Sequence, residues 1–143
     1  MSTSENKDIV RRQWYQELWD NWNVNEADEL FTADYQLHLP GIPTPMNREG
    51  TKQVVKMFSA SFPDLQHTVD EIIGEGNTVA ARWTVRGTHR GEFQGIPASG
   101  RSVRLSGTTV HHLAGGKIVE TWLTFDNQEL LQQLGAVPQA SHV

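Results

Sequence analysis

The chain has 143 residues and no cysteine, which favours one domain with its own hydrophobic core and excludes disulfides, thiolate catalysis and cysteine-based zinc sites. Twelve Lys and Arg residues, scattered along the chain, stand against seventeen Asp and Glu, so the basic footprint of a nucleic-acid-binding protein is missing. No apolar run reaches the ~18 residues of a membrane-spanning helix, and the N-terminus lacks a signal-peptide core. We expect a soluble cytoplasmic protein, with residues 1–143 forming one domain, a core over about 5–135 and loose termini.

The first half of the chain is predicted to be mostly helical. From Glu5 to Trp22 apolar residues repeat every fourth position, which predicts an amphipathic helix with Ser4 as its N-cap. A short second helix is expected at 26–31 and a first strand at 34–39. After a proline-rich loop, helical spacing of apolar residues predicts a third helix at 48–60.

The second half reads as long antiparallel hairpins. Strand-like runs joined by glycine turns are followed by one helix; they cover 65–73, 78–90, 103–113, 118–126 and, for the helix, 127–134 with Gly135 as its C-cap. Because helices come first and hairpins follow, the predicted class is α+β, with helices on one face of a curved sheet.

Alternation along the strands assigns the side chains to two faces. The set predicted to face the concave interior is Val79, Ala81, Trp83, Val85, Gly87 and His89 on one strand, Val103, Leu105, Gly107, Thr109, His111 and Leu113 on the next, and Val119, Thr121, Leu123 and Phe125 on the last. This wall is mostly apolar and suits a bulky, aromatic ligand. The opposite face suits a dimer interface; it carries Arg82, Arg86, Arg104, His112, Glu120 and Trp122.

Several separated motifs resemble the SnoaL-like polyketide cyclases of the NTF2-like superfamily. They are QELWDNWN near the start, FPDL in the middle, then GTHRGEFQGIPASGR, GGKIVETW and LLQQLG. The resemblance covers roughly residues 5 to 135. It implies a cone-shaped, cystatin-like α+β barrel, a homodimer, and a pocket between the helices and the concave sheet. Its best-known members close a ring by a cofactor-free aldol reaction, and other NTF2-like proteins include isomerases, epoxide hydrolases, dehydratases and non-catalytic binding modules.

The resemblance also implies a catalytic pair that this sequence lacks. Characterised cyclases of the family use an Asp on the last strand and a His on the strand before it. Registered on the turn before Lys117, these positions fall at Leu123 and Thr109. The nearest carboxylate, Asp126, is a catalytic candidate, but the residue pattern favours a role as N-cap of the final helix.

Glu17 is the second carboxylate candidate, because it lies one helical turn from Trp14 in the QELW stretch. In a dry, tryptophan-lined pocket its pKa would rise and it could serve as acid or base. The alternative is an exposed glutamate that pairs with Asn21 or with a basic neighbour.

Three histidines, His38, His89 and His111, are candidate proton shuttles or donors to a ligand carbonyl. The alternative for each is a structural histidine whose ring is satisfied by its neighbours. His67 and His112 are expected to face outward. No metal site is expected, because no pair of histidines and carboxylates has ligand spacing.

We therefore expect a cofactor-independent enzyme of polyketide or small-molecule metabolism, similar to polyketide or ester cyclases, that transfers a proton on a hydrophobic carbonyl compound. The catalytic candidates are Glu17, His89, His38, His111 and Asp126, and the predicted pocket residues are Trp14, Trp83, Thr109, Leu123 and Phe125. The competing hypothesis is a non-catalytic module that binds a small apolar ligand or dimerises. Epoxide hydrolase chemistry is a third possibility.

Overall fold

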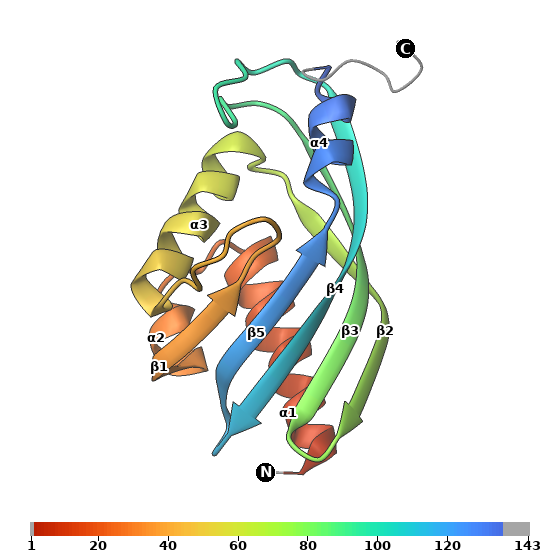
Figure 1. Ribbon diagram of the computed structural model, residues 1–143. Helices are drawn as coiled ribbons and strands as arrows, with labels where there is room; N and C mark the ends of the chain where they lie inside the picture. Colours follow the sequence, from red (N-terminus) through yellow and green to blue (C-terminus); the bar gives the residue numbers. More distant parts are fainter. Residues whose placement is uncertain (1, 136–143) are drawn as a thin grey trace.

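A five-stranded sheet with helices packed against it organises the computed structural model, which describes residues 2–135 (Figure 1). In chain order the elements are α1 (Thr3–Ile9), η1 (Val10–Asp20), α2 (Glu26–Leu30), β1 (Phe31–His38), α3 (Arg48–Ser61), β2 (Gln66–Glu75), β3 (Thr78–Thr88), β4 (Ser102–Ala114), β5 (Lys117–Phe125) and α4 (Asn127–Gln133). The predicted α+β class and the order of elements are confirmed. The expected loose C-terminal end, with His142, lies outside the described residues.

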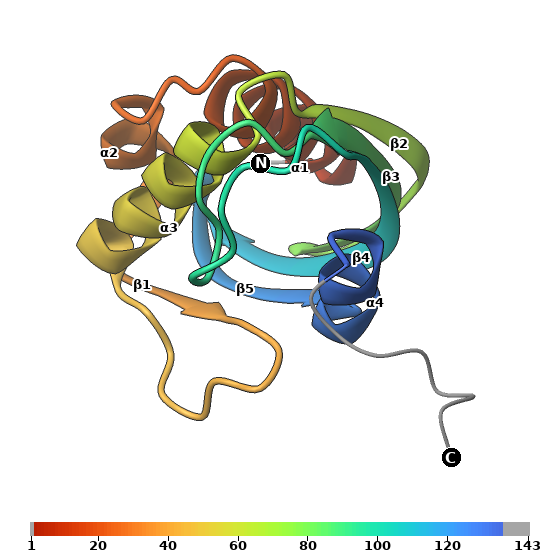
Figure 2. The ribbon, with the colours of Figure 1, turned by 90° about the horizontal axis from the view of Figure 1, so that it is seen from above.

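The strands are arranged in the order β1-β5-β4-β3-β2. Strands β2 to β5 form antiparallel neighbours, whereas β1 pairs in parallel with the last strand. Edge strands β1 and β2 do not pair with each other, so the sheet is curved but unclosed. Figure 2 shows the sheet bending around an interior that the first helices and α3 cover from the open side.

The predicted inward set of side chains is confirmed except at Val119, because a register shift pairs Leu113 with Ile118, which is buried in its place. On β3 and just beyond it, Val79, Ala81, Trp83, Val85 and His89 are all buried. The register places these residues beside the inward residues of β4, which in turn oppose those of β5; one such row contains Ala81, Thr109 and Leu123. A period of two therefore fixes the concave wall across the three strands up to the register shift near the start of β5.

The first helix differs in type from the prediction. Only Thr3–Ile9 is α-helical, and Val10–Asp20 is a π-helix, in which backbone bonds run from residue i+5 back to residue i. The wider turn lets adjacent residues face the interior together. Trp14 and Tyr15 are both buried, as are Leu18 and Trp19.

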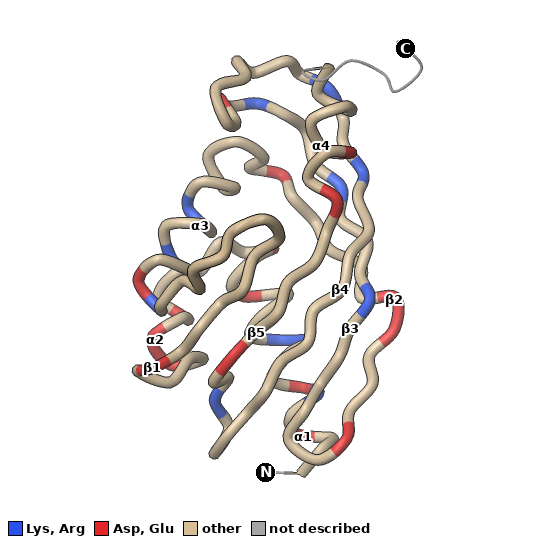
Figure 3. The backbone as a smooth tube through the Cα atoms, in the orientation of Figure 1, with Lys and Arg blue, Asp and Glu red and all other residues tan. Residues whose placement is uncertain are grey.

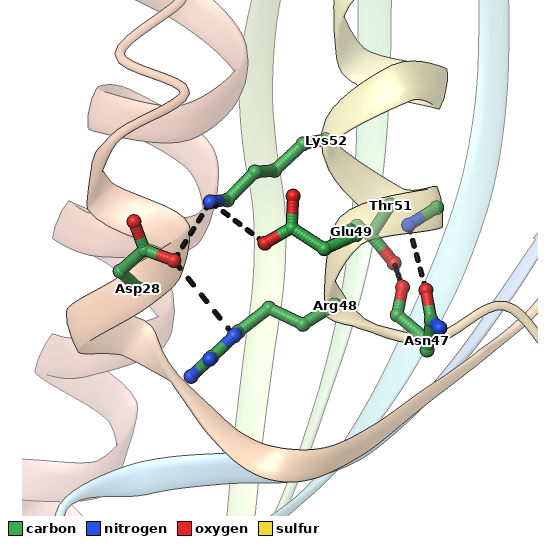
Figure 4. A network of polar contacts seen from close by, with 7 residues as sticks. Asp28, Asn47, Arg48, Glu49, Thr51 and Lys52 are labelled. Carbon is green, nitrogen blue, oxygen red and sulfur yellow. Dashed lines mark hydrogen bonds and ion pairs between the residues drawn. The ribbon is translucent and has the colours of Figure 1, made fainter.

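Helices α2 and α3 are joined by a surface network of charged side chains (Figure 4). Lys52 Nζ lies 2.7 Å from Asp28 Oδ1 and 3.1 Å from Glu49 Oε1. Exposed ion pairs of this kind are screened by water and contribute little to stability. At the start of α3, the Asn47 side chain caps the helix by accepting a hydrogen bond from the Gly50 amide at 2.8 Å.

Two further helix caps bear on the sequence predictions. Ser2, rather than the predicted Ser4, caps α1, because its hydroxyl accepts from the Glu5 amide while the Glu5 carboxylate accepts from the Ser2 amide. Asp126 caps α4 and accepts a hydrogen bond from the Glu129 amide at 3.0 Å.

Charged residues are interspersed over helices and strands alike (Figure 3). The described part of the chain contains no helix that is both long and apolar enough to cross a membrane.

Candidate functional site

A cavity lies between η1, α3 and the concave face of the sheet. Its inner part has a volume of about 60 Å³ and adjoins an outer recess of about 340 Å³. Leu39, Val54, Phe58 and Phe125 line both parts. The recess alone falls within the range of roughly 300–1,000 Å³ that is typical of small-molecule sites. All five residues predicted to form the pocket line the inner part, namely Trp14, Trp83, Thr109, Leu123 and Phe125.

The lining of the inner part is apolar apart from the tryptophan N–H groups and three polar side chains, Tyr15, His67 and Thr109. The ring of His67 is enclosed by aromatic lining residues. Its centroid lies 5.6 Å from that of Tyr15, 5.4 Å from that of Trp83 and 6.1 Å from that of Trp19. Chemistry inside the cavity therefore depends on very few groups.

Asp20, the last residue of η1, binds His67 on β2 at two points. Its Oδ1 atom accepts from the His67 backbone amide at 2.9 Å and lies 2.9 Å from the ring nitrogen Nδ1. A carboxylate only accepts, so this contact places a proton on Nδ1. In the neutral ring Nε2 then carries the lone pair, and it makes no hydrogen bond to any other described residue.

The expectation that His67 faces outward is wrong. Only 8% of its side chain is exposed, and its backbone pairs with that of Val85, whose side chain faces the interior. The available signal was alternation with Leu65 and Val69, which flank His67 at intervals of two residues. This alternation is weak, because β2 contains many polar residues and its register is irregular after Val69.

The other two polar lining residues share a hydrogen bond. The Tyr15 hydroxyl lies 2.6 Å from Thr109 Oγ1, and the same oxygen lies 2.9 Å from Nε2 of His111. Nδ1 of His111 lies 2.9 Å from Thr121 Oγ1. His111 is fully buried beneath Trp14, and this burial lowers its pKa to about 3, so its ring is neutral near pH 7. Burial also raises the pKa of Tyr15, which keeps its proton.

The two carboxylate candidates lie outside the cavity lining. Glu17 accepts hydrogen bonds from Asn21 at 3.2 Å and from Asn23 at 3.4 Å. The contact with Asn21 is the one expected if Glu17 is not catalytic. Asp126 caps α4, as described above. No contact joins either carboxylate to the histidines of the site.

The histidine candidates are dispersed. His38 Nε2 lies 2.6 Å from Glu120, and its ring stacks on Trp122, on the outer face of the sheet. His89 is buried against Phe62 with Nδ1 bonded to Ser99, and it does not line the cavity.

His111 lies behind Thr109 in the sheet, where its ring nitrogens bond to two threonines. His112 is exposed, as expected.

The positions at which the resemblance implies an Asp and a His, Leu123 and Thr109, pair directly across β5 and β4 and both line the cavity. The chain thus has the geometry for the family's pair but not its functional groups. Within residues 2–135 no three His, Asp or Glu side chains gather closely enough to hold a metal ion.

A curved sheet that encloses an apolar cavity with its covering helices defines the NTF2-like fold. The SnoaL-like polyketide cyclase family matches residues 9–134, and the chain belongs to that family. A search of curated protein sequences gave no significant match.

Solved structures with the same fold include candidate polyketide cyclases. IdmH from Streptomyces antibioticus is 34% identical, with a TM-score of 0.80 over 91% of this chain and 98% of that one. A candidate polyketide cyclase from Acidithiobacillus ferrooxidans is 29% identical, with a TM-score of 0.82 over 96% and 100%. AclR from Streptomyces galilaeus, a candidate hydroxylase, is 27% identical, with a TM-score of 0.85 over 96% and 89%.

Proposed function

We propose that this protein is a cofactor-independent acid/base catalyst that removes a proton next to the carbonyl group of a hydrophobic compound, in an aldol-type ring closure or an isomerisation. The observation that carries the proposal is the His67 ring, held by Asp20, on the wall of a mainly apolar cavity. Membership of the polyketide cyclase family supports the same reaction class.

The proposed chemistry follows from the orientation of the ring. Asp20 holds the proton on Nδ1, so the free Nε2 lone pair accepts a proton from the carbon next to the carbonyl. The resulting imidazolium is stabilised by the Asp20 carboxylate in a cavity of low dielectric. In an aldol closure, the enolate carbon attacks a second carbonyl, and the new alkoxide takes the proton back from Nε2.

The two volumes suggest how a ligand would lie. The inner part, at about 60 Å³, has room for one end of a molecule, and the outer recess of about 340 Å³ takes the remainder. A polycyclic compound would then place a terminal ring against Trp83 and extend past Phe58. Polyketide and ester cyclisation both remain within this proposal.

Proton exchange at carbon tests the proposal without knowledge of the natural substrate. 2-Tetralone, an apolar ketone with acidic C–H groups, is incubated with the protein in deuterated buffer, and loss of the proton signal is followed by NMR. We expect exchange above the buffer rate, and a loss of about 10²-fold or more in His67→Gln.

Glu17→Gln is the control, because it also introduces a glutamine but at a position outside the cavity lining. This variant should keep the wild-type exchange rate. Full activity in His67→Gln, or its loss in Glu17→Gln, would contradict the proposed base. A wild-type protein that binds the ketone without any exchange would instead favour the non-catalytic binding module.

A homodimer and a cytoplasmic location are part of the same proposal. Support for the dimer comes from the outer face of the sheet, where Trp122 is 36% exposed and flanked by His38 and His112. Support for the cytoplasm is limited to the lack of cysteine.

A further inference from the structure

A chain of hydrogen bonds leads from the interior of the sheet to the cavity. It runs from Thr121 through His111 and Thr109 to Tyr15, with successive distances of 2.9, 2.9 and 2.6 Å. Thr121 and His111 are completely buried, whereas Thr109 and Tyr15 line the cavity. The acid/base pair takes no part in this chain.

The neutral ring of His111 gives the chain a direction. A neutral imidazole has one N–H and one lone pair, so one threonine donates to it and the other accepts from it. If Nε2 carries the proton, Thr121 donates to Nδ1, Nε2–H donates to Thr109, and the Thr109 hydroxyl donates to Tyr15. The Tyr15 proton is then left free at the cavity.

The opposite direction leaves a buried proton without an acceptor. Tyr15 would donate to Thr109, Thr109 to Nε2, and Nδ1–H to Thr121. The Thr121 hydroxyl makes no other hydrogen bond within residues 2–135, so its proton would be buried without an acceptor. The first direction instead leaves the unpaired proton on Tyr15 at the cavity, where a ligand can accept it, and is therefore preferred.

The cavity lining has further donors without acceptors. The indole Nε1 atoms of Trp19 and Trp83, both lining residues, have no hydrogen-bond partner within residues 2–135. These two nitrogens have almost no accessible surface, so the free Tyr15 proton is the donor that calls for a ligand able to accept a hydrogen bond.

We infer that Tyr15 donates a hydrogen bond to the carbonyl oxygen of a ligand in the cavity, and that Thr121, His111 and Thr109 are positioning residues that turn its proton toward that oxygen. The ligand class is a hydrophobic ketone or ester, and the same donor would stabilise an enolate formed from it. The inference deepens the proposed function and rests on it for the reaction. The rings of Tyr15 and His67 are 5.6 Å apart, so one ligand can meet both.

Binding of a matched pair of probes tests the inference. Acetophenone and α-methylstyrene have nearly the same shape but differ by a carbonyl oxygen in place of a CH₂ group. Tyr15→Phe should weaken acetophenone binding about 3- to 10-fold, the effect of one hydrogen bond, and leave α-methylstyrene binding unchanged. The infrared carbonyl stretch of bound acetophenone should lie at lower frequency in the wild type than in Tyr15→Phe.

Three more variants test the relay. Thr109→Val should reproduce the loss for acetophenone, Thr109→Ser should restore binding, and Glu17→Gln, outside the cavity lining, should bind both probes as the wild type does. Equal affinities and equal carbonyl frequencies in the wild type and Tyr15→Phe would overturn the inference, as would failure of the wild type to bind acetophenone. Ketone binding through Tyr15 without any proton exchange would keep this inference and reject the proposed function.

Discussion

Asp20 Oδ1 lies 2.9 Å from the ring nitrogen Nδ1 of His67, and it accepts a hydrogen bond from the His67 backbone amide, also at 2.9 Å. The contact joins the end of η1 to β2, two segments that are 47 residues apart in the chain. Since 8% of the histidine side chain and 15% of the aspartate side chain are exposed, water competes little for this pair. The tautomer and the orientation of the ring therefore depend on one carboxylate.

Replacement of Asp20 by Asn should change the tautomer of the His67 ring while leaving the ring in place. The amide can still accept from the His67 backbone, but it no longer provides a charged acceptor for Nδ1–H, so we expect a mixture of tautomers. Proton exchange of 2-tetralone should fall about 10-fold or more. Nitrogen-15 NMR of the ring reports the tautomer directly, and an unchanged tautomer with an unchanged rate would exclude this role of Asp20.

Gly107→Ala should destabilise the fold. A Cβ atom at this position would lie 2.3 Å from Cζ2 of Trp83 and 2.3 Å from the carbonyl oxygen of Thr124, closer than real side chains pack. We expect a loss of about 1–3 kcal/mol in the free energy of unfolding, measured by urea denaturation. Ser106→Ala, at the exposed neighbouring position, should change it by less than about 0.5 kcal/mol. Equal midpoints for both variants would contradict this packing.

The free energy of unfolding should decrease as the pH is lowered, because of His111. Burial lowers the pKa of this ring from 6.5 to about 3, so between these values the unfolded chain binds a proton that the folded protein does not. The free energy of unfolding then decreases as pH falls, by up to about 1.4 kcal/mol per pH unit. Carboxylates titrate in the same range, so the quantity to measure is the difference between the wild type and His111→Gln. That difference should shrink as the solution is acidified; a constant difference would argue against a neutral, buried ring.

Trp122→Glu should separate the proposed dimer. The indole is 36% exposed on the outer face of the sheet, and a carboxylate there would place charge in an apolar contact. Light scattering after size-exclusion chromatography should give the mass of one chain for this variant and of two for the wild type. Gln53→Glu, an exposed change on α3, should remain a dimer. A wild type with the mass of one chain would refute the proposal.

Much of the fold could be predicted because its determinants are local. Alternation on the last three strands placed Trp83, Thr109 and Leu123 on the concave face, where they are found. Spacing did not distinguish an α-helix from a π-helix at Val10–Asp20, because apolar residues every fourth position fit one face of either.

The amino-acid sequence by itself determined the α+β class, most strand faces and the family, because these depend on short-range periodicity and on motifs. Only the tertiary structure brought Asp20 to His67, and Tyr15 to Thr109, pairs separated by 47 and 94 residues. It also set His38 beside Glu120, away from the cavity. The positions of protons in a buried site depend on which donors and acceptors come into contact when distant segments pack. Local sequence patterns do not predict those contacts.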